Sequence, residues 1–94
     1  MTHKPCWEDV VCASAGQVSS RLGEEVAVLA LEGGVYYGLN VTAARIWELL
    51  REPIRVSEIG QALVSEYEID AISARRDVLA ILDELSGAGL IEVR

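Results

Sequence analysis

Residues 33–50, GGVYYGLNVTAARIWELL, contain the change from strand to helix that decides the fold. VYYGL (Val35–Leu39) is rich in side chains that strands favour, and the glycine pair before it suits the positive φ angles of a tight hairpin. After this strand the apolar residues recur at helical spacing, and Asn40 or Thr42 can cap the helix. The stretch therefore predicts the end of a hairpin, a strand and then a helix.

Upstream of this stretch the sequence predicts an antiparallel meander. QVSSRL (Gln17–Leu22) and the apolar run VAVLAL (residues 26–31) have strand length and are joined by short turns. The strand Val35–Leu39 comes third, and it forms an edge of the sheet unless something else pairs with it. Residues 1–16 show no periodic pattern, so we expect an irregular N-terminal lead-in over residues 1–16 and one domain over residues 17–94.

Downstream of the stretch we expect three helices and a short terminal strand. The first helix ends before Pro53, the second begins with Ser57 as its N-cap, and the third has Asp70 as its N-cap. The last two helices and the strand after them have the spacing of a winged helix-turn-helix. The predicted fold class is α+β, a winged helix-turn-helix with an N-terminal three-stranded antiparallel sheet and three helices.

Composition and charge narrow the classes of function. A hydrophobic fraction of 51% in 94 residues is typical of one globular domain. The net charge of −7, with one lysine and scattered arginines, argues against a nucleic-acid partner, because phosphate binding needs clustered cations. No apolar run is long enough to cross a bilayer and the N-terminus has no apolar signal segment, so we expect a cytoplasmic protein without a membrane partner.

The sequence offers no catalytic constellation. It contains no GxGxxG, Walker, HExxH or GxSxG motif. Cys6 and Cys12 lack CxxC spacing and His3 is the only histidine, so the ligands for a zinc site are too few and we expect reduced thiols. A catalytic pair of His3 and Cys6 would have nothing to hold it in place near the terminus. We therefore expect a binding module with no catalytic residue, no metal and no cofactor.

The third strand and the third helix together indicate a peptide-binding surface. The strand Val35–Leu39 carries neither the charges nor the proline that protect most edge strands, and Gly38 would let a second backbone come close. On a helical wheel the apolar residues of the third helix cover about half of the circumference, and Arg75 falls inside this arc. Either Arg75 lies along the apolar surface or it stands at the lip of a groove. A homodimer, or cover by the lead-in, is the alternative to an added peptide strand.

The residues around this edge resemble a known family. The PqqD-like family has a signature that the chain resembles at Tyr37-Gly38-Leu39-Asn40, followed by Thr42, Ala43, Ile46, Trp47 and Leu50. The later stretches VSEIGQALVSEYEID, RDVLAILDEL and GLIEV match the rest of the pattern in order and spacing, so the resemblance covers residues 17–94. It implies a winged-helix domain that recognises the leader peptide of a ribosomally made, post-translationally modified peptide (RiPP).

The stand-alone size, together with YYGLN (residues 36–40) and IWELL (residues 46–50), looks most like the leader-binding subunit of split lasso-peptide proteases. The resemblance implies that this subunit presents the precursor to a separate cysteine-protease leader peptidase, after which an ATP-dependent cyclase closes the ring. One alternative is a chaperone that delivers a precursor to another modifying enzyme, such as a radical SAM enzyme. A small winged-helix DNA-binding protein is a further alternative, although the third helix carries more acidic than basic side chains.

The resemblance also implies the residues of the site. The leader would add as a strand to the backbone of Val35, Tyr36, Tyr37, Gly38 and Leu39. The third helix would form the opposite wall through Ile72, Arg75, Arg76, Leu79 and Leu82. Adjacent residues of a strand point to opposite faces, so one tyrosine packs in the core and the other flanks the leader. From their wheel position, we expect Arg75 or Arg76 to meet an acidic leader residue.

Overall fold

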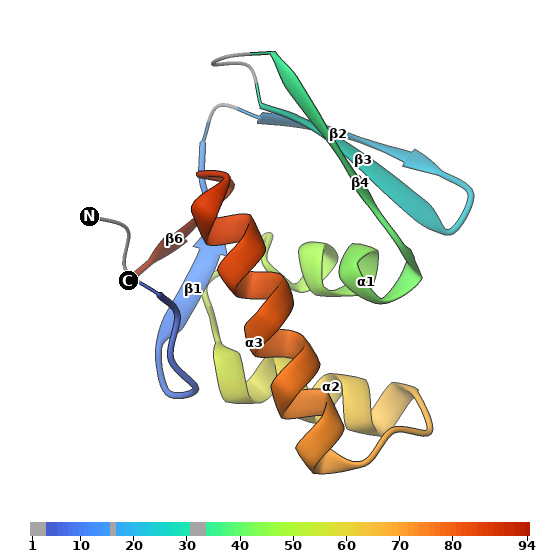
Figure 1. Ribbon diagram of the computed structural model, residues 1–94, viewed down its shortest axis with the longest axis vertical. Helices are drawn as coiled ribbons and strands as arrows, with labels where there is room; N and C mark the ends of the chain where they lie inside the picture. Colours follow the sequence, from blue (N-terminus) through green and yellow to red (C-terminus); the bar gives the residue numbers. More distant parts are fainter. Residues whose placement is uncertain (1–3, 16, 31–33) are drawn as a thin grey trace.

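The described part of the chain folds into two small sheets and three helices, an α+β arrangement (Figure 1). The computed structural model describes residues 4–15, 17–30 and 34–94. The elements run in the order β1 (Val10–Ala13), β2 (Gln17–Leu22), β3 (Glu25–Ala30), β4 (Val35–Leu39), α1 (Val41–Leu49), β5 (Ile54–Arg55), α2 (Val56–Glu66), α3 (Ala71–Gly87) and β6 (Ile91–Val93). All the predicted strands and helices are present, and β1 and β5 are additional.

The sheet β2-β3-β4 is the predicted antiparallel meander, and β4 is one of its outer strands. Val26 pairs with Leu39 and Val28 pairs with Tyr37. Because side chains alternate across a strand, these four residues share one face, and the two valines and Leu39 are buried there. This face packs against α1, whose residues contact both β3 and β4.

The second sheet has the order β5-β1-β6, with β1 in the middle. Val11 of β1 pairs with Ile54 on one side and with Val93 on the other, and its side chain is fully buried. The prediction of an irregular lead-in over residues 1–16 is therefore wrong for Val10–Ala13. Four residues are too few to show a strand period, and both partner strands lie far along the chain, so no local hairpin signal marks β1.

The helix starts follow local capping chemistry. The backbone N–H of Ala43 donates to Oδ1 of Asn40 at 3.0 Å, and the backbone N–H of Ser73 donates to Oδ1 of Asp70 at 2.8 Å, which confirms both as N-caps. The prediction of Ser57 as the cap of α2 is wrong, because α2 already begins at Val56. The backbone N–H of Ser57 instead donates to the carbonyl of Trp7 at 3.0 Å.

One hydrophobic core joins the sheets and the helices. Helix α3 packs along α2 and reaches β6, and buried side chains of all three helices belong to the same hydrophobic cluster. The largest of the fully buried side chains are Ile46, Leu50, Ile59, Leu63, Leu82 and Leu90.

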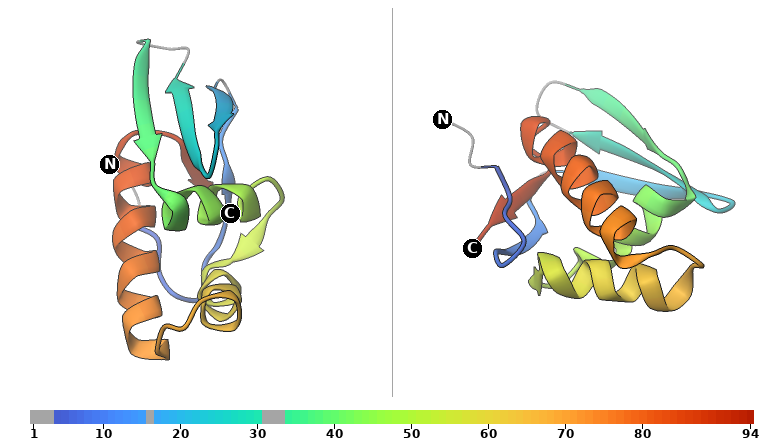
Figure 2. Two further views of the ribbon diagram at one scale, coloured as in Figure 1. Left: turned by 90° about the vertical axis from the view of Figure 1, so that its right-hand side faces the viewer. Right: turned by 60° about the horizontal axis from the view of Figure 1, so that its bottom comes forward.

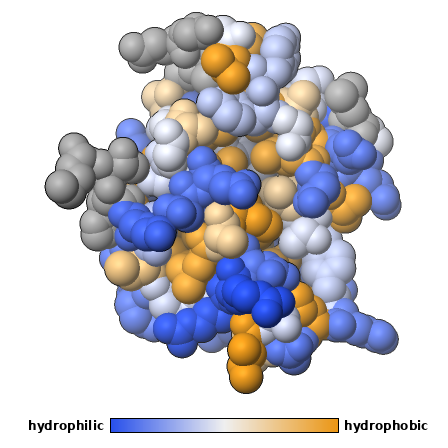
Figure 3. Space-filling view, in the orientation of Figure 1, coloured by the Kyte–Doolittle hydropathy of each residue, from blue (hydrophilic) through white to orange (hydrophobic). Residues whose placement is uncertain are grey.

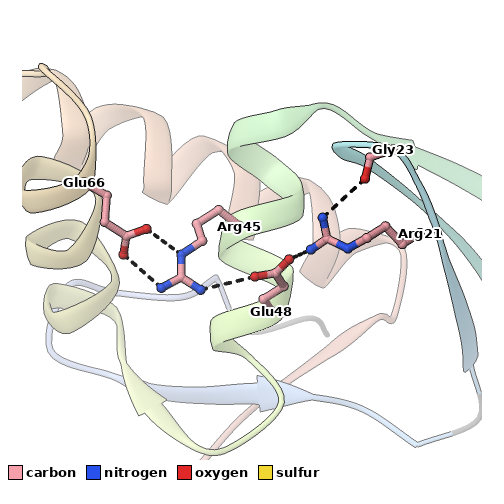
Figure 4. Close-up of polar contacts among 5 residues, drawn as sticks. All are labelled: Arg21, Gly23, Arg45, Glu48 and Glu66. Atoms are coloured by element: carbon pink, nitrogen blue, oxygen red, sulfur yellow. Dashed lines mark hydrogen bonds and ion pairs between the residues drawn. The ribbon is translucent and has the colours of Figure 1, made fainter.

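A chain of ion pairs connects β2, α1 and α2 on the surface (Figure 4). Arg45 donates from Nε and Nη2 to the two carboxylate oxygens of Glu66, at 2.7 and 2.9 Å, and also contacts Glu48. Glu48 in turn pairs with Arg21 of β2. The hydrogen bond from Arg45 holds the pKa of Glu66 below its ordinary value. The network links α1 to β2 on one side and to α2 on the other.

Candidate functional site

The outer edge of β4 is the most unusual surface feature of the fold. Over the residues that the structure describes, β4 pairs with β3 alone, so one side of its backbone has no partner strand. The edge carries no charge or proline, and the side chains of Val35 and Tyr36 are exposed. An unprotected edge of this kind is a template for strand addition by an extended peptide.

The two tyrosines of β4 serve different faces of the sheet. Tyr36 is 70% exposed, whereas Tyr37 is partly buried and packs against the hydrophobic core opposite Val28. Tyr36 is thus the tyrosine that is free to lie beside an added strand on the outer face. At Gly38 a Cβ would meet no atom of the described residues within 4 Å, so none of these neighbours requires a glycine there.

The structure separates the predicted wall residues of α3. Leu82 is fully buried, and Leu79 packs against the same core, so the side chain of Leu82 cannot form part of a surface wall. Ile72 lies in the first turn of α3 and is 82% exposed. Arg76 is exposed, and its Nε lies 3.5 Å from Oδ1 of Asp77.

Arg75 faces the N-terminal segment, residues 4–9, and not β4. Its guanidinium carbon lies 5.0 Å from the centre of the Trp7 ring. On the same flank of α3, Lys4 Nζ lies 3.7 Å from Asp83 Oδ2. In Figure 1 the N-terminal segment and β4 lie on opposite sides of α3. The prediction that Arg75 stands in a wall opposite β4 is therefore not what the structure shows.

The flank of α3 that is turned toward β4 carries different residues. In the left view of Figure 2, β4 is the strand of its sheet nearest to α3. At 100° per residue, the positions opposite the Arg75–Asp83 flank are Asp77, Ile81, Glu84 and Ala88. Ile81 and Ala88 are partly buried against the core, while Glu84 is exposed and Asp77 is about half exposed. This flank therefore presents Ile81 between two carboxylates, with Ala88 beyond Glu84 at the end of the helix.

The sequence-based prediction missed these four residues for a definite reason. A wheel gives the directions of side chains relative to one another, and an apolar arc of about half the circumference has two flanks. The contacts of the N-terminal segment decide which flank is covered, and they depend on Trp7, which no sequence pattern had connected to α3. In the sequence, only the acidic residues on either side of Ile81 could have indicated that this flank of α3 differs from the flank of Arg75.

The chain shows little sign of catalytic or metal chemistry in its described part. No group of three His, Cys, Asp or Glu side chains that could hold a metal ion occurs among the described residues. Cys6 is exposed, Cys12 is buried, and both are free thiols. None of the helices in the described ranges has the length and apolar character needed to cross a membrane.

Comparison with known proteins identifies one matching family and several similar structures. The family model described as Coenzyme PQQ synthesis protein D (PqqD) matches residues 25–91, which include β4, α3 and the start of β6. No curated protein sequence matches the chain.

Three solved structures are similar along most of the chain. TbiB1, in complex with the TbiA(beta) leader peptide, has a TM-score of 0.81 and 37% identity, over 86% of this chain and 94% of TbiB1. Lasso peptide synthetase B1, complexed with the leader peptide, has a TM-score of 0.78 and 27% identity, over 87% of this chain and 96% of that one. The PqqD truncation of Methylobacterium extorquens PqqCD, described as a functional and stand-alone RiPP recognition element, has a TM-score of 0.76 and 25% identity, over 94% of both chains.

Proposed function

The chain belongs to the PqqD family, and on this premise we propose that it is a non-catalytic recognition domain for the leader peptide of a ribosomally made precursor. The observation that carries the proposal is the uncharged edge of β4, which pairs with no further strand of the described residues and lies inside the region that matches the family. The similar structures that contain leader peptides support the same class of ligand.

The leader adds to β4 as a further strand. Main-chain hydrogen bonds to Val35–Leu39 supply affinity that does not depend on sequence, and alternate leader side chains supply specificity. One set of these side chains lies beside Tyr36 on the outer face of the sheet. The other set points toward α3, where it meets Ile81 and Ala88.

The charge on this flank of α3 selects among leaders. Asp77 and Glu84 lie on either side of Ile81, and neither carboxylate is buried. An added strand therefore gains from a basic side chain near the apolar residue that contacts Ile81, in contrast to the acidic leader residue that the helical wheel indicated for Arg75.

The similar structures favour one form of this proposal, in which the precursor is a lasso peptide. The protein then presents the precursor to a separate cysteine-protease leader peptidase, and the ATP-dependent cyclase acts on the released core peptide. The similarity to the recognition element of Methylobacterium extorquens PqqCD favours the second candidate, delivery to a different modifying enzyme such as a radical SAM enzyme.

The test measures the affinity of the synthetic leader of the protein's cognate precursor peptide, by fluorescence anisotropy at low and at physiological salt. The double variant Asp77→Lys/Glu84→Lys should weaken leader binding about tenfold at low salt, and less at high salt. Asp83→Lys is the matched control, because Asp83 is an acidic residue of the same helix on the opposite flank. Equal losses in both variants would contradict the assigned flank, and a leader that does not bind to the unaltered protein would refute the function itself.

A duplex DNA probe in the same assay tests the winged-helix alternative. The exposed surface of α3 carries Asp77, Asp83 and Glu84, so we expect no DNA binding at physiological salt. Tight binding of DNA without binding of the leader would replace the proposal with that alternative.

A further inference from the structure

A second surface lies at the opposite end of the molecule from β4. A cavity of about 250 Å³ opens where α2 meets the start of α3, and its walls are mostly apolar. It is lined by Trp7, Gly60, Gln61, Val64, Ser65 and Ala71. In Figure 1 this junction is at the lower end of the molecule, whereas β4 is in the upper half. A leader strand paired with β4 therefore leaves the cavity open.

The cavity is built by the N-terminal segment as much as by the helices. The indole of Trp7 lies directly on the backbone of α2 at Gly60, where a Cβ would come within 2.4 Å of Trp7 Cη2. The carbonyl of Trp7 accepts a hydrogen bond of 3.0 Å from the backbone N–H of Ser57, which fixes the segment at the first turn of α2. One wall of the cavity is thus held in place by a close fit and by a main-chain hydrogen bond.

Exposed apolar side chains extend the cavity into a patch. Val64, in the cavity wall, is 40% exposed, and Ile72, next to the wall residue Ala71, is 82% exposed. The space-filling view in Figure 3 shows apolar atoms at the lower end of this face, where α3 begins. Single exposed apolar side chains are common, but Val64 lies in the wall of an apolar cavity and Ile72 follows another wall residue in the sequence. Exposed apolar side chains gathered beside an apolar cavity are typical of a protein–protein contact.

The charge beside the cavity identifies the kind of partner. The guanidinium of Arg75 lies over the ring of Trp7, and among the described residues it forms no ion pair. A guanidinium that lies over an aromatic ring can still donate two hydrogen bonds to one carboxylate. A second copy of this chain is a poor occupant, because two molecules of net charge −7 repel each other.

We propose that the α2–α3 patch, formed by Trp7, Val64, Ile72 and Arg75, docks the enzyme that receives the leader. An apolar side chain of this enzyme enters the cavity, and a carboxylate next to it on the enzyme binds Arg75. The proposal rests on the leader-binding function, since it assigns that function's enzyme partner to a surface. The protein then holds the leader at one end and the enzyme at the other, so neither partner competes for the other's site.

The experiment uses the full chain and its purified cognate cysteine-protease leader peptidase, with binding measured by calorimetry in the absence of leader. The double variant Val64→Ser/Ile72→Ser should weaken peptidase binding at least tenfold, and Arg75→Gln should weaken it several-fold. Both variants should keep leader affinity within twofold, which also shows that they are folded. Val41→Ser is the matched control, because Val41 is a valine of nearly the same exposure, 41%, outside the patch.

Three outcomes would overturn the proposal: unchanged peptidase binding in the double variant, an equal loss of leader affinity, or a dimer of the free protein that the double variant abolishes. Each is distinct from failure of the leader-binding function, in which the unaltered protein does not bind the leader.

Discussion

The contact between Trp7 and Gly60 leads to a prediction with an unusual sign. Gly60 lies in the interior of α2, where alanine is normally more favourable than glycine by about 1 kcal/mol. In this fold, however, a Cβ at residue 60 would lie 2.4 Å from Trp7 Cη2 and within 3.1 and 3.3 Å of two further ring carbons. Atoms do not approach to 2.4 Å, so either the indole or the helix must move.

The change in the free energy of unfolding caused by Gly60→Ala is the difference between the cost of the clash with Trp7 and the gain in helix propensity. Overpacking of this kind costs roughly 1–3 kcal/mol. Set against the gain of about 1 kcal/mol in helix propensity, Gly60→Ala should leave the free energy of unfolding unchanged at best and lower it by about 2 kcal/mol at worst. In a Trp7→Ala background the clash is absent, and the same substitution should raise the free energy of unfolding by about 1 kcal/mol.

Urea unfolding followed by far-UV circular dichroism measures all four proteins of this double-mutant cycle. The expected coupling energy between residues 7 and 60 is roughly 1–3 kcal/mol, equal to the cost of the clash. Gly87→Ala is the matched control, because a Cβ at Gly87 meets no atom within 4 Å and its effect should not depend on Trp7. If Gly60→Ala stabilises the protein equally in both backgrounds, Trp7 does not lie on α2.

Three further predictions concern the ion-pair network, the core and a helix cap. The pKa of Glu66 is held below its ordinary value by Arg45, so the pair stabilises the fold above about pH 4.5 and this contribution is lost as the pH falls through the folded-state pKa. Glu66→Gln should therefore lower the free energy of unfolding by about 0.5 kcal/mol at pH 7, a difference that urea titrations should find shrinking toward pH 3; a constant difference would contradict the assignment. Leu82→Ala should cost roughly 2–5 kcal/mol of stability while the folded fraction keeps its leader affinity, and a specific loss of affinity would return Leu82 to the binding wall. Asn40→Ala should cost about 1 kcal/mol in thermal or urea unfolding through loss of the hydrogen bond to the N–H of Ala43, and no cost would mean that α1 needs no side-chain cap.

The sequence predicted those parts of the fold that depend on local patterns. The strand Val35–Leu39 and the caps Asn40 and Asp70 follow from residue types within a few positions, and each agrees with the structure. Strand β1 could not be predicted in this way, because its pairing with β5 and β6 is decided by tertiary packing and its four residues carry no period. The same holds for the first turn of α2, which is fixed by the N-terminal segment.

In the candidate site, too, the features that depend on local sequence were predictable and those that depend on tertiary packing were not. The alternation of a strand correctly predicted that Tyr36 and Tyr37 face opposite sides, and burial then decided which one is exposed. The wall on α3 was not predictable, since both flanks of its apolar arc looked equally available. Trp7, which belongs to no sequence pattern, packs beside Arg75 on one flank of α3. The helical wheel places Ile81 on the opposite flank, and Figure 1 shows β4 on the side of α3 away from the N-terminal segment.

The most direct test of leader binding by strand addition is an NMR study of the isotopically labelled protein with the unlabelled synthetic leader. The account predicts nuclear Overhauser contacts between the leader backbone and Val35–Leu39, contacts between a leader side chain and the methyl groups of Ile81, and slower exchange of alternate backbone amides of β4. A leader that binds with comparable affinity but leaves the amide exchange of β4 unchanged, with its contacts on other elements, would contradict the account.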